Sequence, residues 1–421
     1  MNNEFPTSEE LIRRAEEIAS TLVSRMAETE RRGYYAEDTH RAFQEAGLYR
    51  VLSPKKYGGY EIDIGSFSKI VRAIARGCPS TAWCYGFAVG HSINVCTMFP
   101  QAVWDKIFAD GPDFLSPLTI RPQAEILQQE DGSWLLSGQY DYCSGVPYST
   151  HFTSQAIPVF PDGTKGKPVT FMARREDWTM LGNWGNGDML GMNGSGSHSI
   201  TFDKARIPDD MVLRTEVLSW APSARDPENP QHGDAPIYYG RFTSTLILEI
   251  SSIAVGAVKG ALDEYAGLMQ SRTTMRPPIQ PRRLDTDYRR WFGTATGKIA
   301  VAEAALQGMA EQWMVAAKGQ MAGEKPFSVS DELSLVYIVE DVITQAWEAM
   351  DILWLSAGSS VQRRGERLQT IFRDMSCIRN HALGTFTDLV CRNLSDELLG
   401  TIDETLDSFL GTSYRLTGTQ R

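Results

Sequence analysis

Apolar residues recur at helical spacing through the first hundred positions of the chain. Leu11, Ala15 and Ile18 form the first stripe, and Thr7 and Glu10 just before it have the spacing of a capping box. Three further helices are predicted, over residues 36–46, 64–76 and 81–99. Proline and glycine interrupt the intervening stretch LYRVLSPKKYGGYE, which is therefore expected to be rich in turns. The first part of the chain is expected to be helical.

The pattern changes near residue 114. Short alternating and β-branched runs begin there, separated by clusters of Gly, Pro, Asp and Asn, and they predict strands in a small barrel or sandwich. Long helical patterns return later and predict helices over residues 242–270, 286–319, 328–357 and 371–385. We therefore expect an α+β multidomain fold: an N-terminal helical domain at 1–113, a central β domain at 114–238 and a C-terminal four-helix bundle at 239–421.

Composition and charge narrow the class of protein. The chain has 421 residues, enough for two or three domains, and its 42% hydrophobic and 22% charged content is that of an ordinary soluble protein. The net charge of -11 argues against nucleic acid or an anionic membrane as a partner. We see no apolar run of about 18 residues that would span a membrane, and the acidic start is unlike a secretory signal. We expect a cytoplasmic protein.

The cysteines and histidines lack the spacing of a metal site. The six cysteines form no CxxC pair, and the six histidines form no HExxH motif. Scattered cysteines fit reduced, mostly buried thiols better than a disulfide framework. We therefore expect no metal and no disulfide.

The stretch IFRDMSCIRNHALGT, residues 371–385, carries the most informative chemistry. Its apolar spacing predicts a helix, which would place His381 near the C-terminal end, just before Gly384 and Thr385. Taken alone, His381 is typical of a core or helix-end histidine. The other residues of the stretch change that interpretation.

The stretch resembles the C-terminal signature of the acyl-CoA dehydrogenase superfamily, in which an Arg-Asp pair on a helix is followed about two turns later by a catalytic Glu and a Gly-Thr. Arg373-Asp374 and Gly384-Thr385 match, but the Glu is missing and His381 stands close to its place. Abstraction of a proton from a thioester needs a carboxylate there, so the histidine indicates other chemistry on the same scaffold. The passages LYRVLSPKKYGGYE and GMNGSGSHSITFDKARIPDDMVL also resemble superfamily passages, in the same order.

The branch with histidine at this place, which the chain resembles, is the oxygenase component of two-component flavin monooxygenases of the phenol, p-hydroxyphenylacetate and hydroxy-secosteroid hydroxylase type. The resemblance implies an enzyme that takes reduced FMN or FAD from a separate NAD(P)H:flavin reductase. With O2, and through a flavin C4a-hydroperoxide, it would hydroxylate an aromatic, phenolic substrate. The resemblance also implies a homotetramer. We see no NAD(P)H-binding motif, so no turnover with NADH alone is expected.

The segment CPSTAWCYGFAVGH, residues 78–91, resembles the one that lines the flavin and substrate pocket in this branch. Trp83 and His91 match its tryptophan and histidine, and their interval is slightly over two helical turns, so both could face one cavity. Tyr85 and Phe87 are the other expected substrate contacts. Without the resemblance, a core tryptophan and a helix-face histidine of no function would be the better explanation.

Two further passages resemble flavin-binding segments. In GQYDYCSGVPYSTHF, Ser144 matches a hydroxyl that can donate to flavin N5, and Gly145 lets the backbone approach closely, although a turn serine would look the same. NGSGSHS is rich in glycine and hydroxyls that can hold a phosphate, without the context of a Rossmann site. Ser195, Ser197 and Arg272 are therefore candidate flavin-phosphate ligands, Arg272 because the superfamily carries an Arg after this helix.

The expected mechanism depends on hydrogen-bond donors in a pocket that excludes water, because the oxygen adduct of a reduced flavin otherwise decays to peroxide. Two imidazoles and a hydroxyl supply these groups, one histidine having a near-neutral pKa. We assign His381 to the peroxide or substrate side, His91 to the phenol and Ser144 to N5. The residues alone would allow the two histidines to exchange roles.

Three alternatives remain open on the same scaffold. The chain could be an acyl-CoA dehydrogenase with its base elsewhere, for which Glu249 is the candidate. It could be a flavin monooxygenase that oxidises sulfur or nitrogen. It could also be a non-catalytic flavin-binding or helical assembly protein that kept the fold.

Overall fold

Short helices form the N-terminal part of the protein, as expected. The computed structural model describes residues 5–215, 233–381 and 387–400. The first part contains α1 (Ser8–Leu22), α2 (Met26–Arg32), α3 (Glu37–Glu45), α4 (Ile64–Gly77), α5 (Pro79–Val89), α6 (His91–Met98) and α7 (Gln101–Ile107). The cap before α1 is Thr7, whose hydroxyl accepts the Glu10 amide at 3.2 Å.

The helix predicted over residues 81–99 is two helices, which is a correction. Gly90 separates α5 from α6, and His91 becomes the first residue of α6. A Cβ at Gly90 would lie 1.5 Å from Oε1 of Glu249 on α8, so only glycine fits at this contact. Helices α5 and α6 therefore divide at the residue that contacts Glu249.

The central strands form one curled sheet of seven strands, where we expected a small barrel or sandwich. Its strands are β1 (Glu125–Gln128), β2 (Trp134–Tyr140), β3 (His151–Val159), β4 (Val169–Arg174), β5 (Thr179–Met180), β6 (Ile200–Ile207) and β7 (Val212–Leu213), in the order β5-β6-β2-β1-β3-β4-β7. Only the β1–β3 pair among the described strand pairs is parallel. Buried aromatic residues pack together on the sheet: Tyr140, Phe152, Phe171, Trp178 and Phe202.

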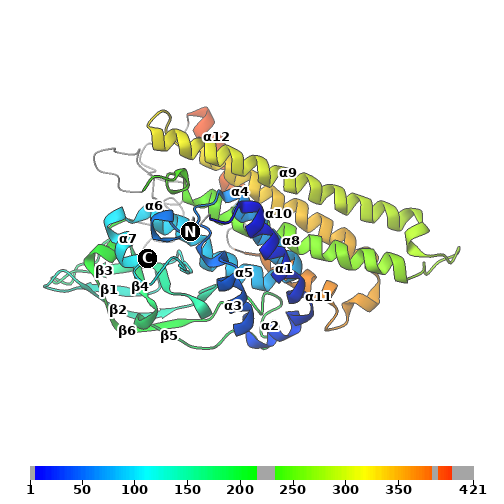
Figure 1. Cartoon of the computed structure of the whole chain (residues 1–421), viewed down its shortest axis with the longest axis horizontal. Coiled ribbons are helices and arrows are strands. Elements are labelled where there is room, and N and C mark those ends of the chain that lie inside the picture. Colours follow the sequence, from blue (N-terminus) through cyan, green and yellow to red (C-terminus); the bar gives the residue numbers. More distant parts are fainter. Residues whose placement is uncertain (1–4, 216–232, 382–386, 401–421) are drawn as a thin grey trace, which may run out of the picture.

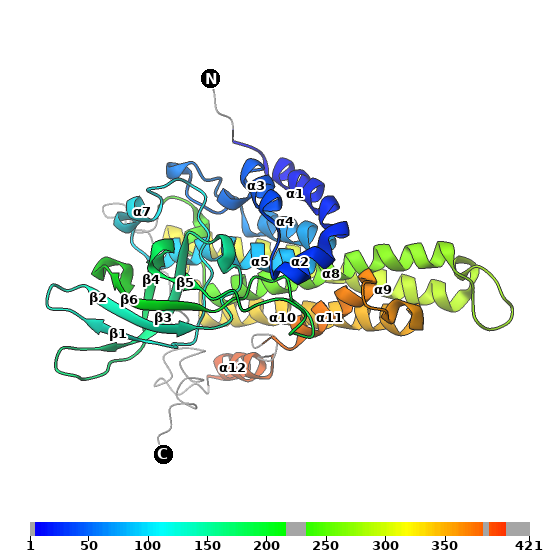
Figure 2. The same cartoon turned by 90° about the horizontal axis from the view of Figure 1, so that it is seen from below.

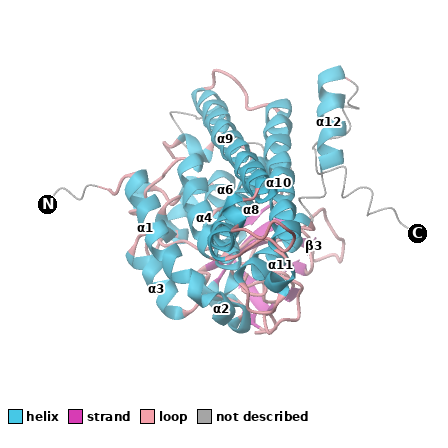
Figure 3. Cartoon of the chain, turned by 90° about the vertical axis from the view of Figure 1, so that its right-hand side faces the viewer, coloured by secondary structure: helices cyan, strands magenta, loops and turns pink. Residues whose placement is uncertain are grey.

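Long helices form the C-terminal part (Figures 1 and 2). They are α8 (Phe242–Ser271), α9 (Thr286–Ala322) and α10 (Val329–Ala357), followed by the shorter α11 (Arg367–Arg379) and α12 (Thr387–Leu399). Figure 3 shows α12 on the outer side of α10. Helix α8 is long and apolar enough to cross a membrane, but 89% of its apolar window is buried inside the protein. It is packed as a core helix.

The helix that carries Arg373 and Asp374 is α11, and its bounds differ from the prediction. It ends at Arg379, and His381 follows in a bend whose backbone N–H donates to the Ile378 carbonyl at 3.1 Å. Gly384 and Thr385 lie outside the described residues. His381 therefore lies just after the end of α11 and not on the helix itself.

The three parts share one continuous hydrophobic core. Helices give way to strands between Ile107 and Glu125, and strands to helices between Leu213 and Phe242. The expected boundaries at 113/114 and 238/239 fall within these intervals and stay predictions about domains. Helix α5 contacts α4, α6, α8 and α11 and is buried along its whole length. It therefore lies at the centre of the molecule, where a site between the parts can be built.

Candidate active site

Helix α5 and the first residue of α6 carry three of the predicted residues at four-residue intervals. The Trp83 and Phe87 rings are stacked with centroids 4.5 Å apart, and the ring of His91 meets Phe87 edge-on at 5.7 Å. All three side chains are buried. A four-residue interval places side chains above one another on a helix, so this row follows directly from the sequence spacing.

The second predicted histidine reaches the same row from the other end of the chain. The ring of His381 lies edge-on to Trp83, with centroids 5.0 Å apart, and 6.2 Å from the centroid of Phe87. Because α11 packs against α5 and α8, the residue after its last turn is carried to α5. Both histidines thus contact the Phe87 ring, and His381 contacts the Trp83 ring as well.

Three serine hydroxyls line up against Trp83. The indole Nε1 of Trp83 donates to Ser144 Oγ at 3.0 Å, Ser144 Oγ is 2.9 Å from Ser197 Oγ, and Ser197 Oγ is 2.7 Å from Ser195 Oγ. Two glycines with positive φ allow this approach, because a Cβ at Gly145 would be 2.7 Å from the Cys84 carbonyl and one at Gly196 would be 2.9 Å from Cys84 Sγ. Both serine segments therefore touch α5 with their backbones.

We call this set the site cluster. Its members are Trp83, Phe87, His91, Ser144, Ser195, Ser197 and His381. Every catalytic candidate lies in it. Ser195 and Ser197, the two serines expected to hold a phosphate, lie in the same row of hydroxyls as Ser144.

His91 is held as a neutral imidazole with a defined tautomer. Its side chain is 0% exposed, and Nδ1 lies 3.1 Å from the Ser116 carbonyl oxygen, so Nδ1 carries the proton and donates it there. Burial lowers the pKa of His91 to about 4, although the Ser116 and Phe87 carbonyls favour the charged form. Nε2 is then a lone-pair acceptor, and it has no hydrogen-bond partner among the described residues.

Burial also lowers the pKa of His381 to about 4. The expectation of one histidine with a near-neutral pKa is therefore wrong for the protein without ligand. The physical reason is that both rings are packed among aromatic side chains, which cannot solvate an imidazolium. Both histidines are neutral at physiological pH.

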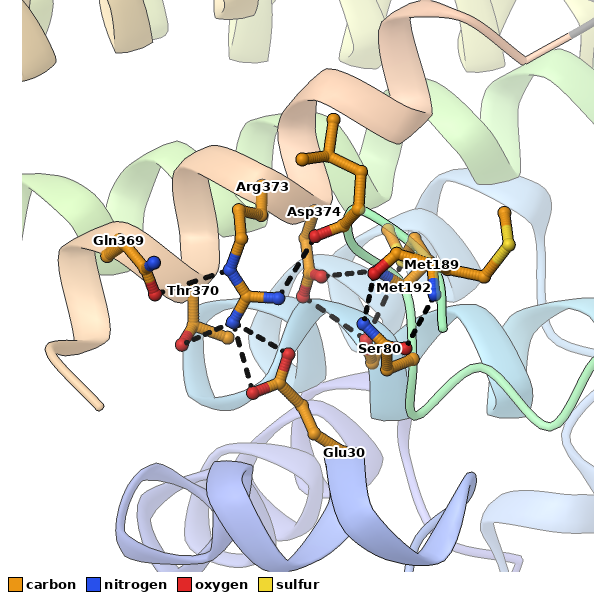
Figure 4. Close-up of polar contacts among 10 residues, drawn as sticks. Glu30, Ser80, Met189, Met192, Gln369, Thr370, Arg373 and Asp374 are labelled. Atoms are coloured by element: carbon orange, nitrogen blue, oxygen red, sulfur yellow. Dashed lines mark hydrogen bonds and ion pairs between the residues drawn. The ribbon is translucent and has the colours of Figure 1, made fainter. Parts of the chain in front are cut away.

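The Arg373-Asp374 pair holds the glycine-rich loop onto α11 (Figure 4). Asp374 accepts the backbone N–H of Met192 at 2.6 Å and the hydroxyl of Ser80 at 3.2 Å. Arg373 donates to the Leu190 carbonyl at 3.0 Å and pairs with Glu30 on α2 at 2.8 Å. Burial raises the pKa of Asp374 to about 7, nearby Glu30 adding to the effect.

Comparison with known families identifies the scaffold. Residues 6–102 match the family model of the acyl-CoA dehydrogenase N-terminal domain, and residues 248–386 match that of the acyl-CoA dehydrogenase C-terminal domain. Together the two matches cover more than half of the chain. The chain belongs to the acyl-CoA dehydrogenase superfamily.

Named oxygenases are similar to this superfamily member over most of its length. The chain is 26% identical to the flavin-dependent monooxygenase, oxygenase subunit HsaA, of Rhodococcus jostii. The alignment of 376 residues covers 88% of this chain and 94% of the relative. The chain is 22% identical over 393 residues to the p-hydroxyphenylacetate 3-hydroxylase, oxygenase component, of Acinetobacter baumannii, which covers 93% and 89%. The relatives confirm the expected class of enzyme, a flavin-dependent monooxygenase.

A solved structure confirms the expected acyl-CoA dehydrogenase-like fold. XiaF from Streptomyces sp., in complex with FADH2 and glycerol, matches with a TM-score of 0.85 and 21% sequence identity, over 95% of this chain and 97% of that chain. The helical, β and helical order predicted from the sequence is the order of this fold.

The dehydrogenase alternative within the superfamily finds no support at Glu249. Its carboxyl is buried against Gly90, seven residues after Trp83, and its charge adds to the raised pKa of Tyr85. Burial raises the pKa of Glu249 well above its usual range. Burial therefore disfavours the carboxylate form that the base of a dehydrogenase needs.

Two predicted residues are not brought to the site cluster. Tyr85 points to the opposite side of α5, where its hydroxyl donates to the Leu48 carbonyl at 2.7 Å and its ring packs on Phe43 and Tyr49. Arg272 caps the far end of α8 and contacts Ser360. Since a helix of this length spans about 45 Å, Arg272 is remote from the cluster within one chain.

Sequence reasoning missed the residues that hold the cluster in place. Ser116 orients His91 through a backbone carbonyl, which no sequence motif could reveal because every residue has one. Ser80 and Met192 bond to Asp374 across large sequence separations. The Arg373-Asp374 pair was recognisable in the sequence, but the sequence did not show which residues it contacts.

A surface groove lies away from the site cluster. It has a volume of about 850 Å³ and is formed by α1, α4, α8 and α9. Its cations are largely paired within the chain: Arg72 and Lys259 with Glu303, and Arg76 with Asp263. None of the predicted site residues lines it. Among the described residues, no three His, Cys, Asp or Glu side chains group as metal ligands.

Proposed function

We propose that this chain is the oxygenase component of a two-component monooxygenase that hydroxylates an aromatic, phenolic substrate. The observation that carries the proposal is Nε2 of His91, a buried lone pair without a partner in the described part of the chain, beside Phe87 in the site cluster. An unpaired buried acceptor costs about 1–3 kcal/mol, so a ligand that donates to it is the expected reason for its presence.

The residues of the site cluster fit a flavin. Two aromatic faces and a row of three hydroxyls match a planar ring whose edge carries nitrogen and oxygen atoms. A bound reduced FMN or FAD would supply the electrons that activate O2 for insertion of one oxygen atom into the substrate. Ser144 already accepts the Trp83 N–H, so its own proton remains available to a flavin edge nitrogen or to Ser197.

His91 acts on the phenol in this proposal. Its Nε2 accepts a hydrogen bond from the phenol O–H, which raises the electron density of the ring that is to be oxidised. With a pKa of about 4, the imidazole is an acceptor and not a strong base. The Nδ1 bond to the Ser116 carbonyl prevents the ring from presenting its N–H in place of the lone pair.

His381 and Ser144 act on the oxygen side. His381 contacts Trp83 and Phe87, and His91 contacts Phe87, so one histidine can serve the substrate while the other donates to the oxygen that is being activated. The burial of Trp83, Phe87 and His91 excludes water, which strengthens each hydrogen bond and limits the loss of activated oxygen as hydrogen peroxide.

The partners follow from the same proposal. The reduced flavin comes from a separate NAD(P)H:flavin reductase. The name of the Rhodococcus relative, an oxygenase subunit, supports a division of the activity between subunits. We further propose a homotetramer in the cytoplasm without a membrane or nucleic-acid partner. Arg272 could reach a flavin at the site cluster only from another copy of the chain, because α8 separates them within one copy.

The test mixes the protein and anaerobically reduced FMN or FAD with oxygenated buffer, with and without a panel of phenols. We expect a long-lived absorbance that differs from those of reduced and oxidised flavin, a lifetime that a phenol shortens, and a product with one ¹⁸O atom from ¹⁸O2. NADH alone should give no product. Immediate reoxidation with release of one equivalent of hydrogen peroxide, for every phenol, would overturn the proposal.

The same experiment separates the alternatives. Thioethers and amines in the panel detect a sulfur- or nitrogen-oxidising monooxygenase, since the labelled atom would then appear on them. A dehydrogenase would instead bind oxidised FAD tightly and be bleached by an acyl-CoA. A non-catalytic flavin-binding protein would give the binding without any labelled product.

A further inference from the structure

Asp374 lies where three segments of the site cluster meet. Ser80, which it contacts, is three residues before Trp83 on α5, and Met192, its other contact, is three residues before Ser195. Asp374 itself is on the helix that ends just before His381. One carboxyl therefore joins the elements that supply the aromatic rings, the hydroxyl row and the second histidine (Figure 4).

In both contacts of Asp374, a carboxyl oxygen accepts the hydrogen bond. The Met192 N–H and the Ser80 O–H point to different carboxyl oxygens of Asp374, which is 0% exposed. Met192 has φ +55°, a conformation that costs a non-glycine residue free energy. The hydrogen bond from its N–H to Asp374 offsets that cost and holds the loop in this turn.

The loop from residue 189 to residue 197, the serine loop, touches its neighbours with bare backbone. A Cβ at Gly191 would lie 2.2 Å from the Arg373 carbonyl oxygen, and one at Gly194 would lie 2.4 Å from Thr29 Cγ2 and 3.1 Å from Ser80 Cβ. The loop therefore fits against α2, α5 and α11 at one distance only. A shift of the loop on α11 would move Ser195 and Ser197 relative to Trp83.

We infer that Asp374 is a positioning residue of the site: it fixes the hydroxyl row against the Trp83 and His381 rings by accepting from both the serine loop and α5. The inference rests on the proposed function for its consequence, which is flavin affinity and the efficiency with which activated oxygen reaches the substrate. Displacing a group by about 1 Å can cost on the order of 100-fold in rate.

The test compares Asp374→Ala and Asp374→Asn with a matched pair at Glu332 on α10. Glu332 is also a buried carboxyl that accepts one backbone N–H, from Ser244 at 2.8 Å, and one serine hydroxyl, from Ser244 at 2.6 Å. Its partner Ser244 is at the start of α8, and Glu332 is outside the site cluster. Glu332→Ala and Glu332→Gln therefore control for the loss of an equivalent buried group. Ser80→Ala removes only the α5 contact.

Three measurements are made on each variant: amide hydrogen exchange without flavin, the flavin dissociation constant, and the fraction of reduced flavin that yields product in place of hydrogen peroxide. We expect Asp374→Ala to accelerate exchange in the serine loop, to weaken flavin binding about tenfold, the equivalent of one lost hydrogen bond, and to lower the coupled fraction. Asp374→Asn should recover part of each, because its amide oxygen still accepts the Met192 N–H. Glu332→Ala should change exchange near α8 and leave the flavin values within about twofold.

Equal flavin values and equal coupled fractions in Asp374→Ala and Glu332→Ala would overturn the inference. If the alanine variant does not fold, Asp374→Asn and Ser80→Ala decide by the same comparison, and wild-type values in both would overturn it. The exchange measurement contains no flavin and no substrate. Fast exchange of the serine loop together with no flavin binding in the wild type would therefore reject the proposed function and leave the positioning role intact.

Discussion

Two aromatic clusters lie on opposite sides of α5, and they differ in how their polar atoms are satisfied. One cluster faces the N-terminal helices. In it the hydroxyls of Tyr35 and Tyr49 are 2.8 Å apart, and Nδ1 of His40 is 2.8 Å from the Tyr49 hydroxyl. The Tyr85 hydroxyl donates to the Leu48 carbonyl. On the other side, Nε2 of His91 has no partner in the described residues.

The difference separates a core from a site. Both clusters are aromatic and buried, so neither composition nor burial distinguishes them. A fully hydrogen-bonded cluster gains nothing from a ligand, whereas an unpaired buried lone pair loses free energy until a ligand donates to it. We infer from the unpaired Nε2, and not from the aromatic rings, that the substrate binds on the His91 side of α5.

The largest effect is expected from His91→Ala, which removes the unpaired nitrogen. We expect hydroxylation of a phenol to fall by about a hundredfold or more, the usual contribution of a group that assists proton movement, measured as rate of product formation under single turnover. His40→Ala, on the core side, is the control and should keep the rate within a few-fold. Equal losses in both variants would remove the distinction between the clusters.

Ser144→Ala tests the hydroxyl row. The substitution leaves the Trp83 N–H without its acceptor and takes away a donor near the flavin, so we expect about a tenfold lower yield of product per reduced flavin and more hydrogen peroxide. Ser149→Ala is the control, because Ser149 is in the same segment and its hydroxyl donates to the local Val146 carbonyl at 2.8 Å. An unchanged ratio of product to peroxide in Ser144→Ala would show that the row has no part in the reaction.

Acidification tests the burial of His91 through the free energy of unfolding. The pKa of His91 is about 4 in the folded protein and 6.5 in the ordinary state, so the unfolded chain takes up the proton first as the pH falls. The stability contributed by neutral His91 is complete above about pH 6.5 and is lost between pH 6.5 and 4. Between pH 7 and pH 5, urea unfolding of wild type should lose about 2 kcal/mol more than that of His91→Gln.

Protonation of Asp374 changes the free energy of unfolding in the opposite direction, because burial raises the pKa of Asp374 to about 7. Asp374 is present in both proteins, so its contribution cancels in the comparison. An equal loss in wild type and His91→Gln would mean that His91 is charged or hydrated in the folded protein.

The smallest effect on the reaction is expected from Tyr85→Phe, on the core side of α5. Removing the hydroxyl leaves the buried Leu48 carbonyl unpaired, so the free energy of unfolding should fall by about 1–3 kcal/mol, measured by urea titration. Hydroxylation and flavin affinity should not change, because Tyr85 is outside the site cluster. A selective loss of phenol affinity would return Tyr85 to the substrate contacts first expected from the sequence.

Much of the fold was predictable from local patterns. The helices α8, α9 and α10 were expected within a few residues of their bounds, because long periodic segments carry their own signal. The row of Trp83, Phe87 and His91 was equally predictable, since a four-residue interval defines a helix face whatever surrounds it. The resemblance to a known superfamily located His381 and Ser144, which no local pattern would single out.

The sequence by itself determined the elements, their order and the residue types available for chemistry. It could not say which side of α5 faces a ligand, because every residue of α5 is buried and no polar face distinguishes Tyr85 from Phe87. Nor could it show that Asp374 joins Ser80 and Met192, or that Ser195 and Ser197 continue the row from Ser144. Those contacts connect residues far apart in the chain, and only the packing of α5, α11 and the serine loop brings their hydrogen-bonding atoms within reach.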